Sequence, residues 1–214
     1  MALMPKIHFS SAPNNLALHT GDDPVHVHSN RIELRSELHM DAIQFMEQSH
    51  GDVVRIVEEH SESDLPADAL ITAKRGLGLA VLVADCIPLL LSSPTCVAAV
   101  HVGRIGMTNG IVDKTIDIME GLGAQGINAW IGPSICGNCY EVSPEMYEEV
   151  TTFFPGSATS SEKHSLDLPR GTVEILRERG IDTHALGLCT LENSKFFSHR
   201  RDKTIGRQAG IVSL

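Results

Sequence analysis

Aromatic residues and basic charge are both scarce in this chain of 214 residues. Phe, Tyr and Trp make up 4% of it, and 17 Lys and Arg stand against 27 Asp and Glu, so the formal net charge at pH 7 is −10. Such a charge repels a phosphate backbone over most of the protein surface. The composition therefore predicts no nucleic-acid partner.

Long hydrophobic runs are also missing from the sequence. The longest strongly apolar stretch, residues 77–84 followed by 87–91, is interrupted by Asp85, Cys86 and Pro88, and is too short and too polar to span a bilayer. Residues 1–10 carry a single Lys and no apolar segment that ends in small residues, unlike a secretory signal. We therefore expect a cytoplasmic protein with no membrane partner.

The cysteines are too few and too scattered for a disulfide framework. Their odd number favours reduced thiols or metal ligands. The five are Cys86, Cys96, Cys136, Cys139 and Cys189.

A single hydrophobic core suits this chain length and its 42% of hydrophobic residues, and we expect one domain over residues 1–214. Short apolar runs rich in β-branched residues predict strands at 53–57, 77–84, 89–91, 97–102 and 185–188. Several of them do not alternate, which is typical of strands buried on both faces. Helical periodicity predicts helices at 32–38, 111–119, 144–153 and 172–179. The predicted fold class is α/β, or α+β in layers, with mixed sheets and helices on their outer faces.

Three side chains of metal-binding type lie next to these predicted strands. Cys86 follows the long apolar strand, His101 ends the next strand before a Gly-rich turn at 103–106, and His50 precedes another strand. Two histidines and one cysteine with an open fourth position suit catalytic zinc. A lone His or a buried Cys is more often a structural residue, so both interpretations stay open on spacing alone.

The order of short motifs along the chain is more specific. They are HG at 50–51, ADCIP at 84–88, AVHVG at 99–103, IGPSIC at 131–136, CYEV at 139–142, CT at 189–190, FFSHRR at 196–201 and GRQAG at 206–210. Together they resemble the YfiH-like laccase-domain family, also called the polyphenol oxidase or purine nucleoside phosphorylase family. The resemblance covers residues 15–214.

This resemblance implies a metal site of two histidines and one cysteine, which maps onto His50, Cys86 and His101. These residues would be both the metal ligands and the catalytic centre, with zinc as the preferred metal and copper as the alternative. Members of the family are assigned phosphorolysis of adenosine, inosine and methylthioadenosine, and deamination of adenosine. The implied partners are thus small molecules, a purine nucleoside and phosphate.

The predicted substrate-binding residues are arginines and one aspartate. Arg201 and Arg207 lie in the closing motifs, and a guanidinium binds phosphate through two N–H groups. On composition alone, Arg201 would belong to a solvated charged turn. Relatives usually read His-Ala-Gly-Trp-Arg-Gly where residues 101–106 read HVGRIG. Arg104, displaced by one position, is the candidate to reach the space of the usual arginine; if it does not, phosphate or substrate binding there is lost. Asp167 either contacts substrate or caps the helix that follows it.

Other polar groups are interpreted as lying outside the metal site. Asp85 either orients a ligand or caps a backbone turn. Cys136 and Cys139 have CxxC spacing without a second CxxC, which favours a loop that lines or approaches the pocket without binding metal. Exposed positions are expected for His19, His26, His28 and His39.

Three alternatives to a nucleoside phosphorylase follow from the same motifs. Copper-dependent oxidation of phenols is suggested by the family name, but a multicopper centre needs many more ligands than the three that the motifs supply. Hydrolysis of an amide in a cytoplasmic peptidoglycan precursor is also associated with the family. A non-catalytic homologue would follow from loss of the usual arginine beside His101.

Overall fold

The computed structural model describes residues 5–159 and 163–214, so the first four residues of the segment examined for a secretory signal lie outside it. Its strands are β1 Lys6–Phe9, β2 Ala42–Gln44, β3 Met46–Glu47, β4 Val54–Ile56, β5 Leu65–Pro66, β6 Ala69–Thr72, β7 Leu77–Val83, β8 Ile87–Ser92, β9 Val97–Val102, β10 Asn128–Ile131, β11 Asp182–Ala185 and β12 Gln208–Ser213. Its α-helices are α1 Pro24–Glu37, α2 Arg104–Thr108, α3 Ile111–Gly121, α4 Pro144–Phe153, α5 Leu168–Glu178 and α6 His199–Asp202, with short 3-10 helices at Leu18–Thr20 and Pro155–Ser157.

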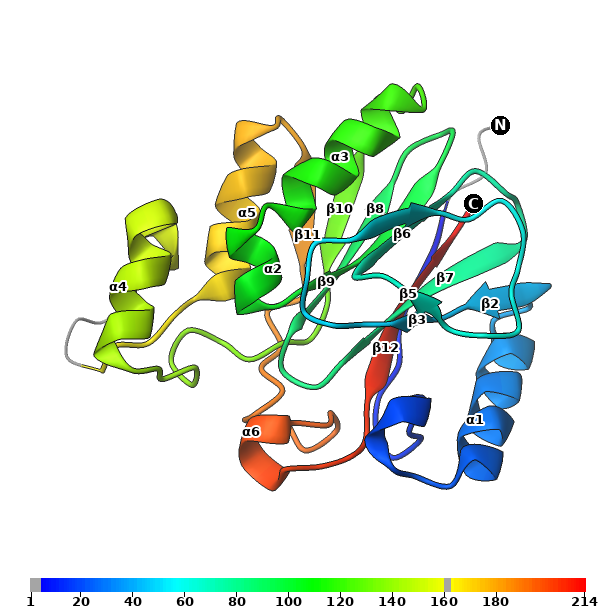
Figure 1. Cartoon of the computed structure of the whole chain (residues 1–214), viewed down its shortest axis with the longest axis horizontal. Helices are drawn as coiled ribbons and strands as arrows, with labels where there is room; N and C mark the ends of the chain where they lie inside the picture. The colour runs from blue at the N-terminus through cyan, green and yellow to red at the C-terminus, as the bar shows by residue number, and fades with distance from the viewer. Residues whose placement is uncertain (1–4, 160–162) are drawn as a thin grey trace.

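Two mixed sheets form the centre of the molecule (Figure 1). One has the strand order β1-β12-β7-β2, and the other has the order β11-β10-β8-β9-β6-β4. A small parallel pair, β3-β5, lies beside them. Strands β8 and β9 are antiparallel, with Pro88 opposite His101, so the start of β8 adjoins the end of β9. This register brings the segment before β8 next to the segment after β9.

The central strands bury both faces, which explains their continuous apolar sequences. In β8, Leu89 and Leu91 face the helices, whereas Leu90 faces the four-stranded sheet. In β7, Val81 packs between the sheets and Leu82 faces the layer that contains α1. Alternate side chains of each strand therefore pack into two different hydrophobic cores.

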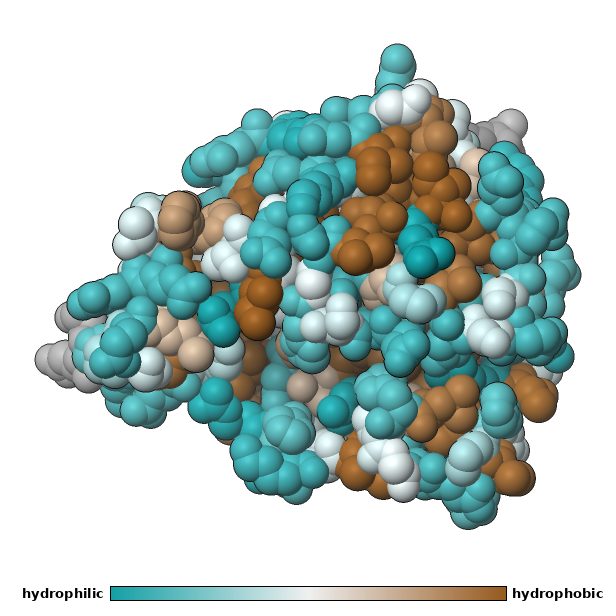
Figure 2. Space-filling model, viewed as in Figure 1, coloured by the Kyte–Doolittle hydropathy of each residue, from teal (hydrophilic) through white to brown (hydrophobic). Residues whose placement is uncertain are grey.

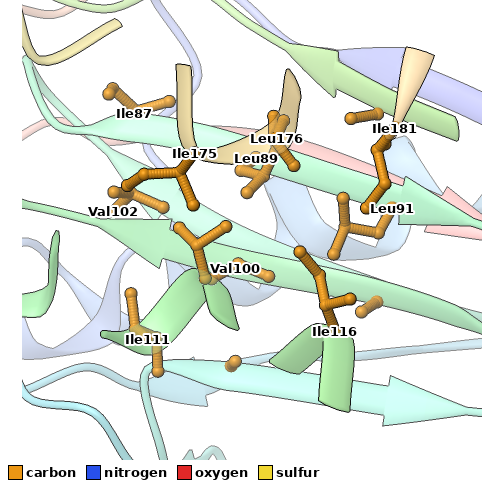
Figure 3. Packing of buried hydrophobic residues seen from close by; sticks show 14 of the residues in the cluster. Ile87, Leu89, Leu91, Val100, Val102, Ile111, Ile116, Ile175, Leu176 and Ile181 are labelled. Atoms are coloured by element: carbon orange, nitrogen blue, oxygen red, sulfur yellow. The ribbon is translucent and has the colours of Figure 1, made fainter. Parts of the chain in front are cut away.

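Helices cover the outer faces of both sheets. Helices α2, α3 and α5 lie over the six-stranded sheet, and Ile111, Ile116 and Ile175 point from them toward the side chains of β8 and β9 (Figures 1 and 3). Helix α1 places Leu34 against the four-stranded sheet. Over the described residues, no helix is both long and apolar enough to cross a membrane. Hydrophilic residues cover most of the face seen in Figure 2, and apolar ones gather in separate patches.

The predicted fold class is confirmed, and the predicted strand 97–102 coincides with β9. Three local predictions were wrong. The helix placed at 32–38 begins at Pro24, because the Asp23 carboxylate caps it by accepting the N–H of Val25. The strand predicted at 185–188 lies instead at Asp182–Ala185, as β11. It is an exposed edge strand, and its polar residues give no apolar signal. The turn at 103–106 is the start of helix α2.

Candidate active site

The three predicted metal ligands meet at one place. His50 lies in the loop after β3, Cys86 between β7 and β8, and His101 in β9. One ligand atom from each residue lies within 4.8 Å of the others. The two imidazole rings are 4.6 Å apart between centroids and nearly perpendicular, at 77°. Three donors at this spacing leave a fourth coordination position for a substrate or water.

The backbone beside two of these ligands is held in the left-handed region. His50 has φ 62° and Asp85, next to Cys86, has φ 94°. Such a conformation costs a non-glycine residue about 1–3 kcal/mol and persists only where other contacts enforce it. The Asp85 carboxylate accepts the hydroxyl of Thr190 at 2.7 Å and the backbone N–H of Arg200 at 2.7 Å. These bonds show that Asp85 ties the C-terminal loop to the strand end that carries Cys86.

Gly103 leaves room for the cluster. A methyl group added at this position would lie 3.2 Å from Cδ2 of His50 and 3.3 Å from Sγ of Cys86. Those distances are tighter than ordinary van der Waals contact. A side chain at residue 103 would therefore push the ligands apart.

Asp68 is the buried partner that orients the cluster. Its side chain is 0% exposed, and its carboxylate lies 2.9 Å from Nδ1 of His101. It also accepts the backbone N–H groups of His50 at 2.9 Å and Gly51 at 2.8 Å. The contact at Nδ1 leaves Nε2 of His101 free for a metal, the carboxylate–histidine–metal arrangement found in many metalloproteins.

Electrostatics favour the thiolate form of Cys86. Burial by itself would raise the pKa of this thiol, but the charge of His101 and hydrogen bonds from both histidines outweigh it and lower the pKa. Burial likewise opposes the charge on His101, yet Cys86 and Asp68 raise the pKa of the imidazole. Because the thiolate is the form that binds metals, the donor set fits a soft or borderline divalent cation such as zinc.

An open pocket of about 340 Å³ lies in front of the three ligands. This volume is in the usual range for small-molecule sites. Basic and hydrogen-bonding side chains join the ligands in its wall: His19, Gln48, Tyr140, His199, Arg200 and Arg207. Burial raises the pKa of Tyr140 above the usual value for a phenol, and the nearby Cys86 adds to the effect. The pocket thus combines a three-donor centre with groups that attract anions.

The predicted substrate-binding residues do not all reach this pocket. Arg207 lines it, with one N–H group donating to the Thr204 carbonyl at 3.0 Å. The guanidinium of Arg201 instead donates to backbone carbonyls, including those of Thr190 at 2.7 Å and Phe196 at 2.9 Å.

The other two lie further out. Arg104 pairs with Glu149 of α4 at 3.6 Å and contacts Tyr140, which lines the pocket. Asp167 caps α5 by accepting the N–H of Arg170, and it lies beside a different hollow of the surface.

Several functional residues went unnoticed in the sequence. Asp68 carries a weak signal, a lone carboxylate directly before the buried strand β6. Arg200, which lines the pocket and donates from its guanidinium to the Glu141 carbonyl at 2.9 Å, precedes the predicted Arg201, and nothing in the sequence tells which of the two arginines lines the pocket. His19, expected to be a simple surface residue, is exposed but lines the pocket wall.

Comparison with known proteins extends over nearly the whole chain. The family model described as multi-copper polyphenol oxidoreductase laccase matches residues 7–214. Purine nucleoside phosphorylase ORF3 of Streptomyces griseus is 43% identical over 212 residues, which cover 94% of this chain and 86% of that protein. Purine nucleoside phosphorylase YfiH of Escherichia coli is 33% identical over 210 residues, with the same coverage of 94% and 86%. The crystal structure of the Bacillus licheniformis hypothetical protein YfiH matches with a TM-score of 0.88 at 28% identity, over 98% of this chain and 92% of that one.

Proposed function

Because this chain belongs to the multi-copper polyphenol oxidoreductase laccase family and is similar to proteins named purine nucleoside phosphorylase, we propose that it is a metal-dependent purine nucleoside phosphorylase. The observation that carries this proposal is the pocket itself. It joins the His50, Cys86 and His101 centre to two arginines, Arg200 and Arg207, in one open cavity. A phosphorolytic enzyme needs such cations, because its second substrate is an anion.

We propose zinc as the resident metal and copper as the alternative. His50, Cys86 and His101 would hold the ion, and Asp68 would orient His101 toward it. When bound, a divalent cation supplies Lewis-acid polarisation of an oxygen atom in the pocket. One thiolate and two imidazoles suit zinc at such an open site.

The chain's own side chains have separate roles in this proposal. Arg200 and Arg207 bind and orient phosphate. Tyr140, a protonated phenol in the pocket wall, donates a hydrogen bond to the departing purine. In the reaction, a phosphate oxygen forms a bond to C1′ of the ribose, and the C1′–N9 bond breaks with its electron pair on the base, which takes up a proton. The products are the free purine and the 1-phosphate of the sugar, which keeps its 5′ substituent.

We propose adenosine, inosine and methylthioadenosine as substrates, with deamination of adenosine as a second reaction of the same pocket. We propose that the reaction takes place in the cytoplasm, which the odd number and wide spacing of the cysteines in the sequence favour.

The direct test incubates the zinc-loaded protein with each nucleoside, with and without phosphate. We expect free base and sugar phosphate in equal amounts, and only when phosphate is present. Deamination would convert adenosine to inosine whether or not phosphate is added. Cys86→Ala should abolish turnover, whereas Asp113→Asn, on the outer surface of α3, should leave it unchanged. Absence of base, sugar phosphate and inosine with every nucleoside would refute the proposal.

The same protein preparation distinguishes the alternatives. Phenol oxidation that requires copper would favour the oxidase. Cleavage of a UDP-linked muramyl peptide would favour the amide hydrolase. Nucleoside binding without any turnover would favour a non-catalytic homologue.

A further inference from the structure

A second cluster of metal-binding side chains lies away from the pocket. Cys136 and Cys139 come from the loop after β10, and Cys189 and Glu192 come from the loop after β11. One ligand atom from each of the four lies within 4.8 Å of the others. None of the four lines the pocket in front of His50, Cys86 and His101. The cluster is therefore a separate feature of the fold.

The spacing of these four residues has the form of two matched half-sites. Cys136 and Cys139 are three positions apart, and so are Cys189 and Glu192. Two such pairs are the usual ligand pattern of structural zinc sites, here with a carboxylate in place of the fourth thiolate. Parallel strands β10 and β11 are hydrogen-bonded neighbours, and a bridge from Ser134 to Cys189 continues their pairing, so both pairs emerge at the same edge.

The backbone around Cys189 supports the anionic form of its sulfur. The N–H of Cys136 points at Sγ of Cys189 at 3.4 Å. An N–H group directed at a sulfur in this way stabilises the thiolate form that binds a metal.

One distance within the cluster matches tetrahedral zinc coordination. Zn–S bonds near 2.3 Å and Zn–O bonds near 2.1 Å place neighbouring tetrahedral ligands about 3.5–3.8 Å apart. Sγ of Cys139 lies 3.6 Å from Oε1 of Glu192. Calcium and magnesium prefer oxygen ligands, so three sulfurs select zinc or another soft cation.

We propose that Cys136, Cys139, Cys189 and Glu192 form a second, structural zinc site that joins the two loops behind the active-site pocket. Three thiols release their protons to solvent when the ion binds. Four protein ligands close the coordination shell, which is typical of a structural rather than a catalytic zinc.

Both loops of the cluster contact residues that form or support the active-site pocket. The first loop continues directly to Tyr140, which lines the active-site pocket, and its Ile135 donates a backbone N–H to the Asp85 carbonyl at 2.9 Å. The second loop carries Thr190, whose hydroxyl donates to the Asp85 carboxylate. Zinc at the cluster would fix both loops relative to each other, and so the pocket wall that they support.

Metal content is the first test. The protein is prepared with a non-thiol reductant, saturated with zinc, desalted and analysed for bound metal. We expect two zinc ions per chain in the wild type, one in Cys86→Ala, and one in Cys139→Ser. The control is Cys96→Ser, which should keep both ions. Cys96 is buried in the helix-side core, the cluster between the six-stranded sheet and helices α2, α3 and α5. The proposal would be overturned if the wild type bound one zinc ion per chain and Cys139→Ser still bound that ion.

Cobalt identifies the ligands even if one variant folds poorly. With Co²⁺ added to Cys86→Ala, three thiolates at the second site should give a thiolate-to-cobalt charge-transfer band about three times as intense as one thiolate gives. Glu192→Gln, a mild exposed change, should shift the visible bands and weaken Co²⁺ binding. Absence of any charge-transfer band in Cys86→Ala, with folding verified by circular dichroism, would overturn the proposal. So would a Cys136–Cys139 disulfide that resists the reductant.

Discussion

Replacing Asp68 by Asn probes the carboxylate that organises the metal centre. The carboxylate is fully buried and accepts hydrogen bonds from His101, from the three backbone N–H groups of residues 49–51 and from the Ser49 hydroxyl. Burial raises its pKa, but those donors outweigh burial and bring the pKa from 3.8 to about 2. This difference corresponds to about 2 kcal/mol of folding free energy. An amide of the same shape cannot accept from all these donors, so we expect Asp68→Asn to cost at least about 2 kcal/mol.

The pH dependence has a definite sign. Because the pKa of Asp68 is lower in the folded state, its contribution is complete well above pH 3.8 and is lost as the pH falls toward about 2. The difference in unfolding free energy between wild type and Asp68→Asn should therefore be about 1 kcal/mol smaller at pH 3 than at pH 7. Urea denaturation of the metal-free proteins at both pH values measures it. In the same variant, zinc affinity at the first site should fall roughly 10–100-fold, because His101 loses its orienting partner.

The control for this experiment is Asp113→Asn, a half-exposed carboxylate that pairs with Arg179 on the surface. We expect it to change stability by less than about 1 kcal/mol and zinc affinity not at all. If Asp68→Asn were as stable as this control and bound zinc with wild-type affinity, the role given to Asp68 would be wrong.

Three further predictions concern the pocket and the core. Gly103→Ala should weaken zinc binding roughly tenfold or more, measured by competition with a chelator, because its methyl group would crowd His50 and Cys86; unchanged affinity would contradict this steric argument. Arg207→Gln should raise the KM for phosphate about tenfold with a smaller change in kcat, and should also lower stability, because its guanidinium donates to the Thr204 and Gly206 carbonyls. Arg201→Gln, which loses bonds to backbone carbonyls and does not line the pocket, should lower stability by about 1–3 kcal/mol and leave the KM for phosphate unchanged. Steady-state kinetics measure the difference, and an equal rise in KM in both variants would refute the assignment. Leu89→Ala, at a fully buried position of β8, should cost about 2–5 kcal/mol in urea denaturation; a cost below 1 kcal/mol would contradict the packing described for the helix-side core.

The sequence predicted the parts of the fold whose signal is local. Strand β9 and the layered architecture follow from apolar runs, because a strand with two buried faces is apolar throughout. The short strand β2 escaped notice and the edge strand β11 was misplaced, since three or four residues, or polar ones, carry no periodicity. Helix α1 was placed eight residues late, although Asp23 and Pro24 form a strong start signal.

The site shows the same limit. His50, Cys86 and His101 could be predicted because residue type and motif order identify them. Asp68 could not, because its importance depends on strand β6 pairing with β9, a contact between distant segments.

Adjacent arginines are also ambiguous in a sequence, since the backbone of a four-residue helix decides which one faces the pocket. The cysteine cluster was missed for another reason. Its second half pairs Cys189 with Glu192, 53 positions after Cys139, so no second CxxC marks it and the first pair was interpreted as a loop without metal.

The central claim is that His50, Cys86 and His101 hold one metal ion in a pocket that accepts a nucleoside and phosphate. Crystals soaked with zinc, inosine and phosphate, and measured at the zinc absorption edge, test it most directly. We predict an anomalous peak bonded to all three side chains, with phosphate against Arg200 and Arg207. No peak among those three side chains, in crystals that take up zinc elsewhere, would contradict the account.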